Sequence, residues 1–261
     1  MRERTPLTAP LLDRLPRLRL VVTSGIHNAS IDLAACAERG VTVCGTASSS
    51  TPPAELTWAL VLGLARQVLP EALALRAGEW QTTIGTDLAG ATLGLVGLGR
   101  IGTQVAAVGR AFGMELVAWS PHLTDDRAAA AECAASRQAR AFVESDVVSV
   151  HLVVAEATRG LVDATAIGAM RESAYLVKTS RAGLVDDDAL LAALDAGRLR
   201  GTGLDVFDDE PLPADHPLRR HPRVLATPHL GYVTAENYRR YFGEAVDDVE
   251  AWLDGSPVRV L

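Results

Sequence analysis

The chain has 261 residues, of which 48% are hydrophobic, 22% charged and 5% aromatic, and its formal net charge is −7. This length suits one large domain or two modest domains with well-formed cores. The negative charge and the few aromatic side chains argue against a nucleic-acid partner, because such a partner needs phosphate neutralisation or base stacking. We therefore expect the function to depend on a localised site.

The cysteines and the N-terminal segment indicate a reduced, cytoplasmic protein without a metal site. Cys36, Cys44 and Cys133 are scattered and have no metal-ligand spacing, so we interpret them as small buried apolar residues. The first ten residues are polar and interrupted by proline, unlike a secretory signal. The longest apolar stretch, near residues 58–65, is too short to cross a bilayer, and we expect no membrane partner.

The first part of the chain alternates strands and helices. Residues 18–23 form a short β-branched run that predicts a buried strand, 28–39 have helical spacing, and 41–44 predict the next strand. This order favours a parallel α/β layer. A long, mostly apolar helix is predicted over about 53–77, and we expect it to link two domains.

Short buried strands continue to alternate with helices from Ala91 onward, after a polar segment at 78–90. This alternation predicts a doubly wound parallel sheet. An alanine-rich helix is expected around 128–135, and a final amphipathic helix over 235–254 with Tyr238, Phe242, Val246 and Trp252 near one face. The other alternating elements are expected at 93–96, 101–112, 116–119, 139–142, 147–152, 174–178, 187–197, 203–206 and 224–226.

A glycine motif follows the strand expected at 93–96. A lone GxGxxG is weak evidence, but here it lies between a strand and a helix, as dinucleotide binding requires. Gly97 would form the tight turn, Gly99 would let the backbone approach a pyrophosphate, and Gly102 would allow close packing of helix and strand. The N–H groups at the helix start, around Arg100 and Ile101, would face the phosphates. The alternative is a glycine-rich turn without a ligand.

The next strand ends without the acid that usually binds the ribose 2′-hydroxyl of NAD. It continues into Ser120, Pro121 and His122, and Ser120 can bind either a hydroxyl or a phosphate. Arg100, His122 and Arg127 could supply positive charge for a 2′-phosphate; alternatively, Arg127 is solvated and His122 caps a loop. We expect NADP or NAD as the cofactor and favour NADP, because the missing acid removes a penalty against a second anion.

Five motifs together resemble the D-isomer-specific 2-hydroxyacid dehydrogenase family. They are VGLGRIG (96–102), SDVVSVHL (145–152), LVKTSRAGLVDDDAL (176–190), GLDVFDDEPLP (203–213) and ATPHLGYVT (226–234). The resemblance covers most of the chain from about residue 18 and implies an α/β fold with a Rossmann-type sheet, a smaller flavodoxin-like substrate domain and a homodimer. The implied domains are a substrate domain with the hinge helix at 1–72, a Rossmann domain at 73–232, and a C-terminal helix at 233–261 that returns to the first.

Three residues resemble the family's catalytic set. Arg181 matches the arginine that binds the substrate carboxylate and carbonyl oxygen, Glu210 the acid that pairs with the histidine, and His229 the general acid/base. The chemistry suits these groups, because an imidazolium can donate the proton that must follow the hydride and a guanidinium can stabilise the developing oxyanion. The alternatives are a surface arginine and a structural histidine, but both residues closely follow apolar strands, which favours the catalytic interpretation.

The same resemblance implies further contacts. Asp205 matches the aspartate that meets the nicotinamide carboxamide, or else it caps a strand end. Thr179 and the segment of His151 match positions on the nicotinamide side. In the first domain, the backbone N–H groups of the loop at 24–26 would hold the substrate carboxylate, and the loop at 48–50 is a weaker candidate. The residues of the first loop are Ser24, Gly25 and Ile26.

The chain departs from the family pattern in three places. Lys178 replaces the usual Asn, either as a harmless strand-end charge or as a second cation near the cofactor, and Ala182 replaces the usual Gly after Arg181. The chain also begins where the third strand of the substrate domain should be ending. We therefore expect an N-terminally truncated substrate domain or a misassigned start.

The expected activity is reversible hydride transfer between NAD(P)H and a small 2-oxo acid, the product being the D-2-hydroxy acid. One alternative is a catalytically silent dinucleotide sensor or corepressor of the same fold, although a sensor would not need Arg181, Glu210 and His229 together. A second is a phosphonate or hydroxy-acid oxidising enzyme of the same family. The substrate's side chain is not specified, because specificity depends on loops of the first domain.

Overall fold

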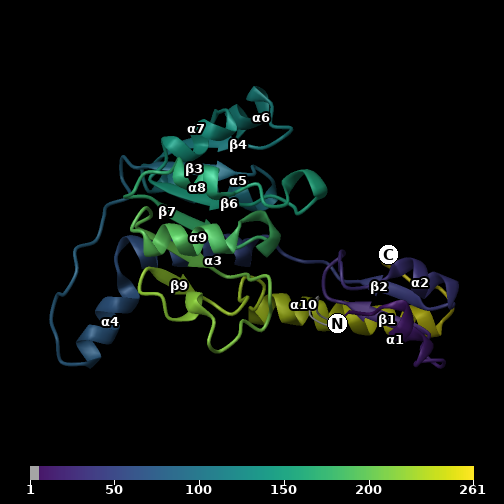
Figure 1. Cartoon of the computed structure of the whole chain (residues 1–261). Coiled ribbons are helices and arrows are strands. Elements are labelled where there is room, and N and C mark those ends of the chain that lie inside the picture. Colours follow the sequence, from purple (N-terminus) through teal and green to yellow (C-terminus); the bar gives the residue numbers. More distant parts are fainter. Residues whose placement is uncertain (1–5) are drawn as a thin grey trace. The chain divides into compact units, whose positions relative to one another are not determined.

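The computed structural model describes residues 6–261, which divide into two units. The larger unit, Ser50–Gly231, contains one seven-stranded sheet in which all neighbouring strands are parallel. Its strand order is β5-β4-β3-β6-β7-β8-β9, which is the doubly wound arrangement that the sequence predicts (Figure 1). The strands are β3 (Thr92–Val96), β4 (Glu115–Trp119), β5 (Ala134–Ala135), β6 (Val147–Val150), β7 (Tyr175–Lys178), β8 (Gly201–Leu204) and β9 (Val224–Ala226).

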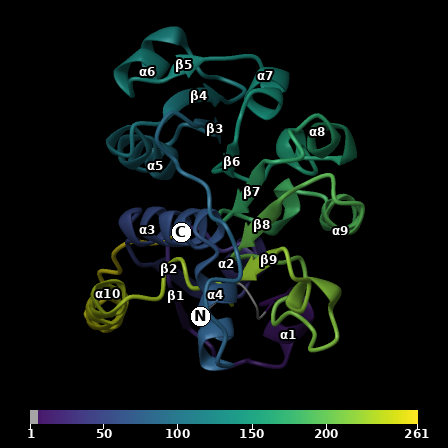
Figure 2. The ribbon, with the colours of Figure 1, turned by 90° about the vertical axis from the view of Figure 1, so that its left-hand side faces the viewer.

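Helices cover both faces of this sheet. Figure 2 shows α3 and α5 on one side and α7, α8 and α9 on the other. Two apolar clusters correspond to these faces: Leu93 and Leu95 of β3 pack with α3 and α5, whereas Val96 packs with the residues of α7–α9. The helices are α3 (Thr51–Ala65), α4 (Val68–Arg76), α5 (Arg100–Ala111), α6 (Asp125–Ala130), α7 (Gln138–Val143), α8 (Ala164–Gly168) and α9 (Asp187–Asp195), with short 3-10 turns at Glu156–Thr158, Ala182–Leu184 and Pro217–Arg219.

The helix predicted over 53–77 is two helices, and both lie in the larger unit. The chain breaks between α3 and α4 at Gln67, whose φ is +52°, and the two axes differ by 62°. Pro70, in the first turn of α4, has no N–H to donate to the Arg66 carbonyl, so the helical hydrogen bonds are interrupted here although the apolar pattern continues. The alanine-rich helix expected around 128–135 is also shorter, because Glu132 takes a positive φ and the chain continues into β5.

The smaller unit combines the residues up to Ser49 with Tyr232–Leu261. Its two strands pair in parallel, with Leu20 opposite Thr42 and Thr23 opposite Gly45. Apolar side chains of α1, α2 and the strands form its core, including Leu12, Val21, Cys36 and Val43. The elements are α1 (Ala9–Asp13), β1 (Leu20–Thr23), α2 (Leu33–Glu38), β2 (Thr42–Gly45) and α10 (Ala235–Leu253).

The buried face of α10 differs from the predicted one. Phe242 is 69% exposed and Val246 56%, whereas Asn237, Tyr241 and Asp248 are buried. Asn237 and Tyr241 are hydrogen-bonded within the unit: Asn237 Oδ1 accepts from the Ser49 N–H at 3.3 Å, and Tyr241 OH lies 3.0 Å from Ser48 Oγ. Asp248 Oδ1 accepts from Arg259 Nε at 2.9 Å, whereas its buried Oδ2 has no hydrogen-bond partner among the described residues. The apolar pattern failed because hydrogen bonds, and not only apolar contacts, hold this helix.

Within residues 6–261, no single helix is long and apolar enough to cross a membrane, and only the bent pair α3–α4 meets those criteria jointly.

Candidate active site

The sheet of the larger unit has a topological switch point between β3 and β6. From these central neighbours the strand order continues outward in opposite directions, toward β4 and β5 on one side and β7–β9 on the other. In open α/β sheets, ligands bind in the crevice at the carboxyl ends of the strands at such a point. Gly97 follows β3 and His151 follows β6, so the glycine motif lies where a ligand is expected.

The glycine motif has the geometry that a dinucleotide cradle needs. Gly97 has φ of +108°, and a Cβ there would lie 2.7 Å from the His151 carbonyl carbon. A Cβ on Gly102 would overlap the Gly97 carbonyl oxygen, whereas a Cβ on Gly99 would enter open space. Gly99 caps α5, so the first N–H groups of a twelve-residue helix face that space. These residues fit a pyrophosphate, which the space above Gly99 and the N–H groups of Arg100 and Ile101 would receive.

The loop after β4 contains Ser120 and His122. Ser120 is half-buried, and its carbonyl accepts from the Leu123 N–H at 3.1 Å. His122 is exposed, and its carbonyl accepts from Arg127 Nη1 at 3.4 Å. Arg127 is therefore held next to this loop, although Asp125 and Asp126 also begin α6 there.

Arg181 lies in the loop after β7, at the same edge of the sheet. Its side chain is exposed, and Nη1 donates to the Ser180 carbonyl at 2.9 Å. The two residues before it are anchored: Ser180 Oγ donates to the Val150 carbonyl at 2.8 Å, and Thr179 Oγ1 lies 2.7 Å from Thr57 Oγ1 of α3. An exposed guanidinium on an anchored loop is suited to binding an incoming carboxylate.

His229 and Glu210, which are 19 residues apart, form a direct contact. His229 Nδ1 lies 2.6 Å from Glu210 Oε2, and both side chains are largely buried. Glu210 Oε1 accepts from the Phe207 N–H at 3.1 Å, which fixes the carboxylate. With Glu210 accepting at Nδ1, the proton resides on that nitrogen, and Nε2 on the opposite side of the ring can exchange a proton with a substrate.

Asp205 organises the segment that carries His229. Its Oδ1 accepts from Thr227 Oγ1 at 2.6 Å and from the Leu230 N–H at 2.7 Å, and its Oδ2 from the Gly231 N–H at 2.8 Å. His229 between these donors has φ of +56°, a conformation that non-glycine residues rarely adopt. Burial raises the pKa of Asp205, while the hydrogen bonds partly offset that rise. The predicted carboxamide contact stays a prediction; what the structure shows is a carboxylate that holds a strained turn.

His151 is neutral in this environment. Burial lowers its pKa to about 4, its Nε2 lies 2.8 Å from Ser149 Oγ, and its buried Nδ1 has no hydrogen-bond partner among the described residues. Its backbone N–H donates to the Val96 carbonyl at 2.7 Å, which joins the ends of β6 and β3.

The predicted substrate loop at 24–26 lies in the smaller unit. Gly25 has φ of +87°, and its N–H donates to Thr46 Oγ1 at 3.1 Å, so that amide is engaged within the unit. Ser24 is half-buried and Ile26 is exposed. Carboxylate binding by this loop remains an expectation.

Sequence reasoning missed how Lys178 is used. Its side chain is completely buried, and Nζ lies 2.5 Å from Asp187 Oδ1, so it is not a solvated strand-end charge. Asp187 was visible as one of three consecutive acids at a helix start, a position where acids are common, so nothing singled it out.

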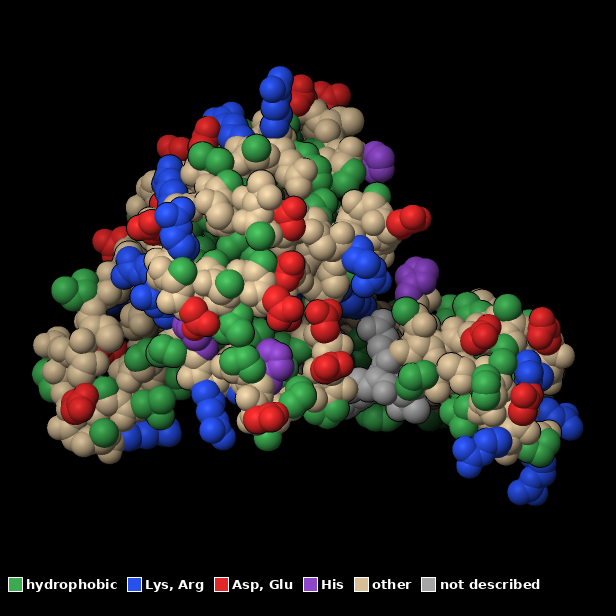
Figure 3. Space-filling model, viewed as in Figure 1, with side chains coloured by type: hydrophobic (Ala, Val, Ile, Leu, Met, Phe, Trp, Pro, Cys, Tyr) green, Lys and Arg blue, Asp and Glu red, His purple; other side chains and the backbone are tan. Residues whose placement is uncertain are grey.

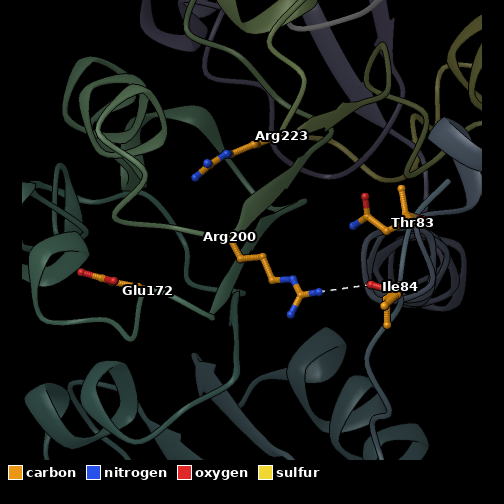
Figure 4. Close-up of a pocket in the computed structure, with 6 residues that line it drawn as sticks. Thr83, Ile84, Glu172, Arg200 and Arg223 are labelled. Atoms are coloured by element: carbon orange, nitrogen blue, oxygen red, sulfur yellow. Dashed lines mark hydrogen bonds between the residues drawn. The ribbon is translucent and has the colours of Figure 1, made fainter.

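Two cavities lie at opposite edges of the sheet. One, of about 380 Å³, includes Gly183, Asp187, Phe207 and Asp208 and adjoins the loops of Arg181 and Glu210. The other, of about 340 Å³, is lined by residues that precede strands, such as Glu172, Arg200 and Arg223, and by the segment after α4 (Figure 4). Only the first edge is the carboxyl edge, where ligands bind in such sheets.

Comparisons with known proteins identify the family of this chain. Residues 58–231 match the family model for the NAD-binding domain of D-isomer specific 2-hydroxyacid dehydrogenases. The chain is 34% identical to the D-3-phosphoglycerate dehydrogenase of Bacillus subtilis over 99% of its own length, and it spans half of that relative. It is also 34% identical to the hydroxypyruvate reductase of Thermotoga maritima over 95% of its own length, and it spans 82% of that relative.

Solved structures agree with these relatives. The phosphoglycerate oxidoreductase of Vibrio cholerae superposes with a TM-score of 0.93 at 38% identity, covering 97% of this chain and 82% of that one. The D-lactate dehydrogenase of Aquifex aeolicus, solved with NAD and lactic acid, gives 0.83 at 30% identity, covering 96% and 80%. The chain therefore belongs to the D-isomer specific 2-hydroxyacid dehydrogenase family.

Proposed function

We propose that this chain transfers hydride between NAD(P)H and a small 2-oxo acid, reducing it to the D-2-hydroxy acid. The observation that carries the proposal is the contact between His229 and Glu210 at the edge that also carries Arg181 and the glycine cradle. A dinucleotide sensor needs the cradle but has no use for a carboxylate-bound histidine and an exposed arginine at the same edge of the sheet.

Each residue has a defined task in this reaction. The nicotinamide, when bound, supplies the hydride. Arg181 binds the substrate carboxylate and stabilises the negative charge that develops on the carbonyl oxygen. His229 donates its Nε2 proton to that oxygen, and Glu210 stabilises the resulting orientation and positive charge at Nδ1. In the oxidative direction His229 accepts the proton from the hydroxyl.

The test is the variant Arg181→Ala with glyoxylate and hydroxypyruvate as substrates. Removing one charge-assisted contact to the reacting group should lower kcat/KM by about 30-fold to 1000-fold, equivalent to roughly 2–4 kcal/mol. The dissociation constant for NADH, from fluorescence titration, should stay near the parental value. Arg171→Ala, at the opposite edge of the sheet, is the matched control. Parental rates in Arg181→Ala, or NADH binding without reduction of any 2-oxo acid in the parent, would contradict the proposal.

We further propose that NADPH is accepted at least as well as NADH. This rests on the absence of a carboxylate from residues 119–122 and on His122 and Arg127 beside Ser120. Ser120→Asp should raise the ratio of NADH to NADPH efficiency, because an acid there binds a ribose hydroxyl and repels a 2′-phosphate. A strong parental preference for NADH would refute this reading.

We also propose that the chain forms a homodimer through α4 and the segment that follows it. Within the described chain α4 buries none of its residues, and its leucines are exposed, as are Trp80 (77%) and Ile84 (87%) in the segment that follows. Figure 3 shows hydrophobic side chains at the lower left, where α4 lies. Several exposed apolar side chains on one segment are typical of an association site. The segment is ordered by Glu71, whose carboxylate accepts from the Thr82 and Thr83 side chains at 3.0 and 2.6 Å.

Light scattering on a sizing column tests the dimer. Leu73→Glu/Leu75→Glu should give a monomer, because charges cannot be buried unpaired in an interface. Phe242→Glu, which places a charge on an exposed apolar residue of α10, is the control and should leave the mass unchanged. A monomeric parent would exclude this proposal.

A further inference from the structure

The buried ion pair between Lys178 and Asp187 has no role in the reaction as described above. Lys178 is the last residue of β7, a strand between β6 and β8, and its side chain is completely buried. Asp187 is the first residue of α9, and its side chain is 16% exposed. Removing a lysine and an aspartate from water costs several kcal/mol per ion, so such a pair is weak evidence for added stability.

A buried pair can instead fix one arrangement of the groups around it. This pair joins the end of a strand to the start of a helix, and Arg181 lies in the loop between the two. Burial raises the pKa of Asp187, and the neighbouring Lys178 ammonium partly offsets that rise.

Lys178 also connects to both sides of the site through its backbone. Its carbonyl accepts from the Asp205 N–H at 3.0 Å, and Asp205 in turn holds the turn of His229. On the Arg181 side, Thr179 and Ser180 are anchored to Thr57 and Val150. The loop is therefore fixed at its start by hydrogen bonds, and the ion pair ties its start to its end.

We propose that Lys178 and Asp187 form a positioning pair that closes the Arg181 loop and sets the place of the guanidinium that receives the substrate carboxylate. The inference rests on the proposed role of Arg181. Displacing a positioning group by about 1 Å can lower the rate by about 100-fold. A loop that is fixed at both ends should therefore keep the reaction fast.

The test uses the double variant Lys178→Met/Asp187→Asn, because removal of one partner alone would leave a buried charge and could prevent folding. We expect a melting temperature near the parental one, an NADH dissociation constant within about twofold, and kcat/KM for glyoxylate lowered by about tenfold or more, mainly through a higher KM. The matched control is Arg198→Met/Glu172→Gln, which removes the exposed pair at the opposite ends of α9 and β7 and should change none of these.

Introducing the same double substitution into Arg181→Ala separates positioning from general disruption. If the pair acts through Arg181, the residual kcat/KM of that variant should not fall further. A parental kcat/KM in the double variant, or an equal loss with and without Arg181, would overturn the inference. Parental activity of Arg181→Ala alone would instead contradict the proposed function, so the two failures are distinguishable.

Discussion

The two edges of the seven-stranded sheet are built from the same strands but hold their polar groups differently. At the carboxyl edge, the side chains of Asp205 and Lys178 are completely buried. Asp205 accepts hydrogen bonds from the His229 segment, and Lys178 forms an ion pair with Asp187. At the amino edge, Arg171 pairs with Asp146 at 2.7 Å and Arg198 with Glu172 at 3.1 Å; Asp146 is half-buried and the other three side chains are exposed.

This difference indicates at which edge of the sheet the positions of the loops are fixed. Exposed ion pairs contribute little and allow small movements, because water competes for both partners. Buried hydrogen bonds and buried pairs are costly to break, so they define the position of each loop. A site that must align a histidine, an arginine and a cofactor therefore belongs at the carboxyl edge, and equivalent changes at the two edges should have unequal effects.

The largest difference between substitutions at the two edges is expected for the two histidines that flank β9. His229→Asn should lower the rate of 2-oxo acid reduction by about 10²-fold to 10⁴-fold, because it removes the proton donor. His221→Asn, at the amino end of the strand, alters only contacts to the Arg223 N–H and to Asp195 and should leave the rate unchanged. Steady-state kinetics with glyoxylate measure both rates. Equal rates in the two variants would contradict the prediction that only the histidine at the carboxyl edge takes part in the reaction.

His151 should make stability depend on pH. Its folded-state pKa of about 4 lies below the ordinary value of 6.5, so the unfolded chain takes up the proton first as the pH falls. Stability is therefore expected to be full above about pH 6.5 and to fall by about 3 kcal/mol as the pH approaches 4. Urea unfolding across this range measures the effect, and His151→Gln should flatten that part of the profile. An unaltered profile in the variant would assign the acid sensitivity to other groups.

Smaller effects are expected for two glycine-to-alanine changes. The added methyl group of Gly102→Ala overlaps the Gly97 carbonyl oxygen, which should cost about 1–3 kcal/mol of stability and weaken NADH binding. Gly168→Ala, in α8, meets nothing within 4 Å and should leave binding unaffected. Calorimetric titration with NADH compares the two; unaffected binding by Gly102→Ala would show that the cradle can shift.

The smallest effect is expected at the amino edge. Arg171→Met removes an exposed pair and should change the unfolding free energy by less than about 1 kcal/mol, with the difference shrinking further at high salt. A loss of several kcal/mol would mean that this edge is as constrained as the other.

The sequence predicts local and motif-based features well, and features that depend on tertiary contacts poorly. The strand at 93–96, the glycine turn and the parallel sheet follow from short-range patterns, and the structure contains all three. The break at Gln67 has a local signal in Pro70, three residues later, but the continuous apolar pattern on both sides of it favours a single helix. The partner of Lys178 and the role of Asp205 depend on which loops meet at the sheet edge, and spacing along the chain does not encode that.

The buried polar face of α10 has a consequence for how this helix can vary. Apolar contacts are non-directional, so a helix held by them alone can rotate or slide by a residue at modest cost. The hydrogen bonds that Glu244 and Asn237 accept from the backbone N–H groups of residues 47 and 49, and the one between Tyr241 and Ser48, require specific distances and angles. They admit one rotation and one register of the helix. Variation should therefore accumulate on the outward apolar residues, such as Phe242 and Val246, while the polar residues beneath them stay fixed.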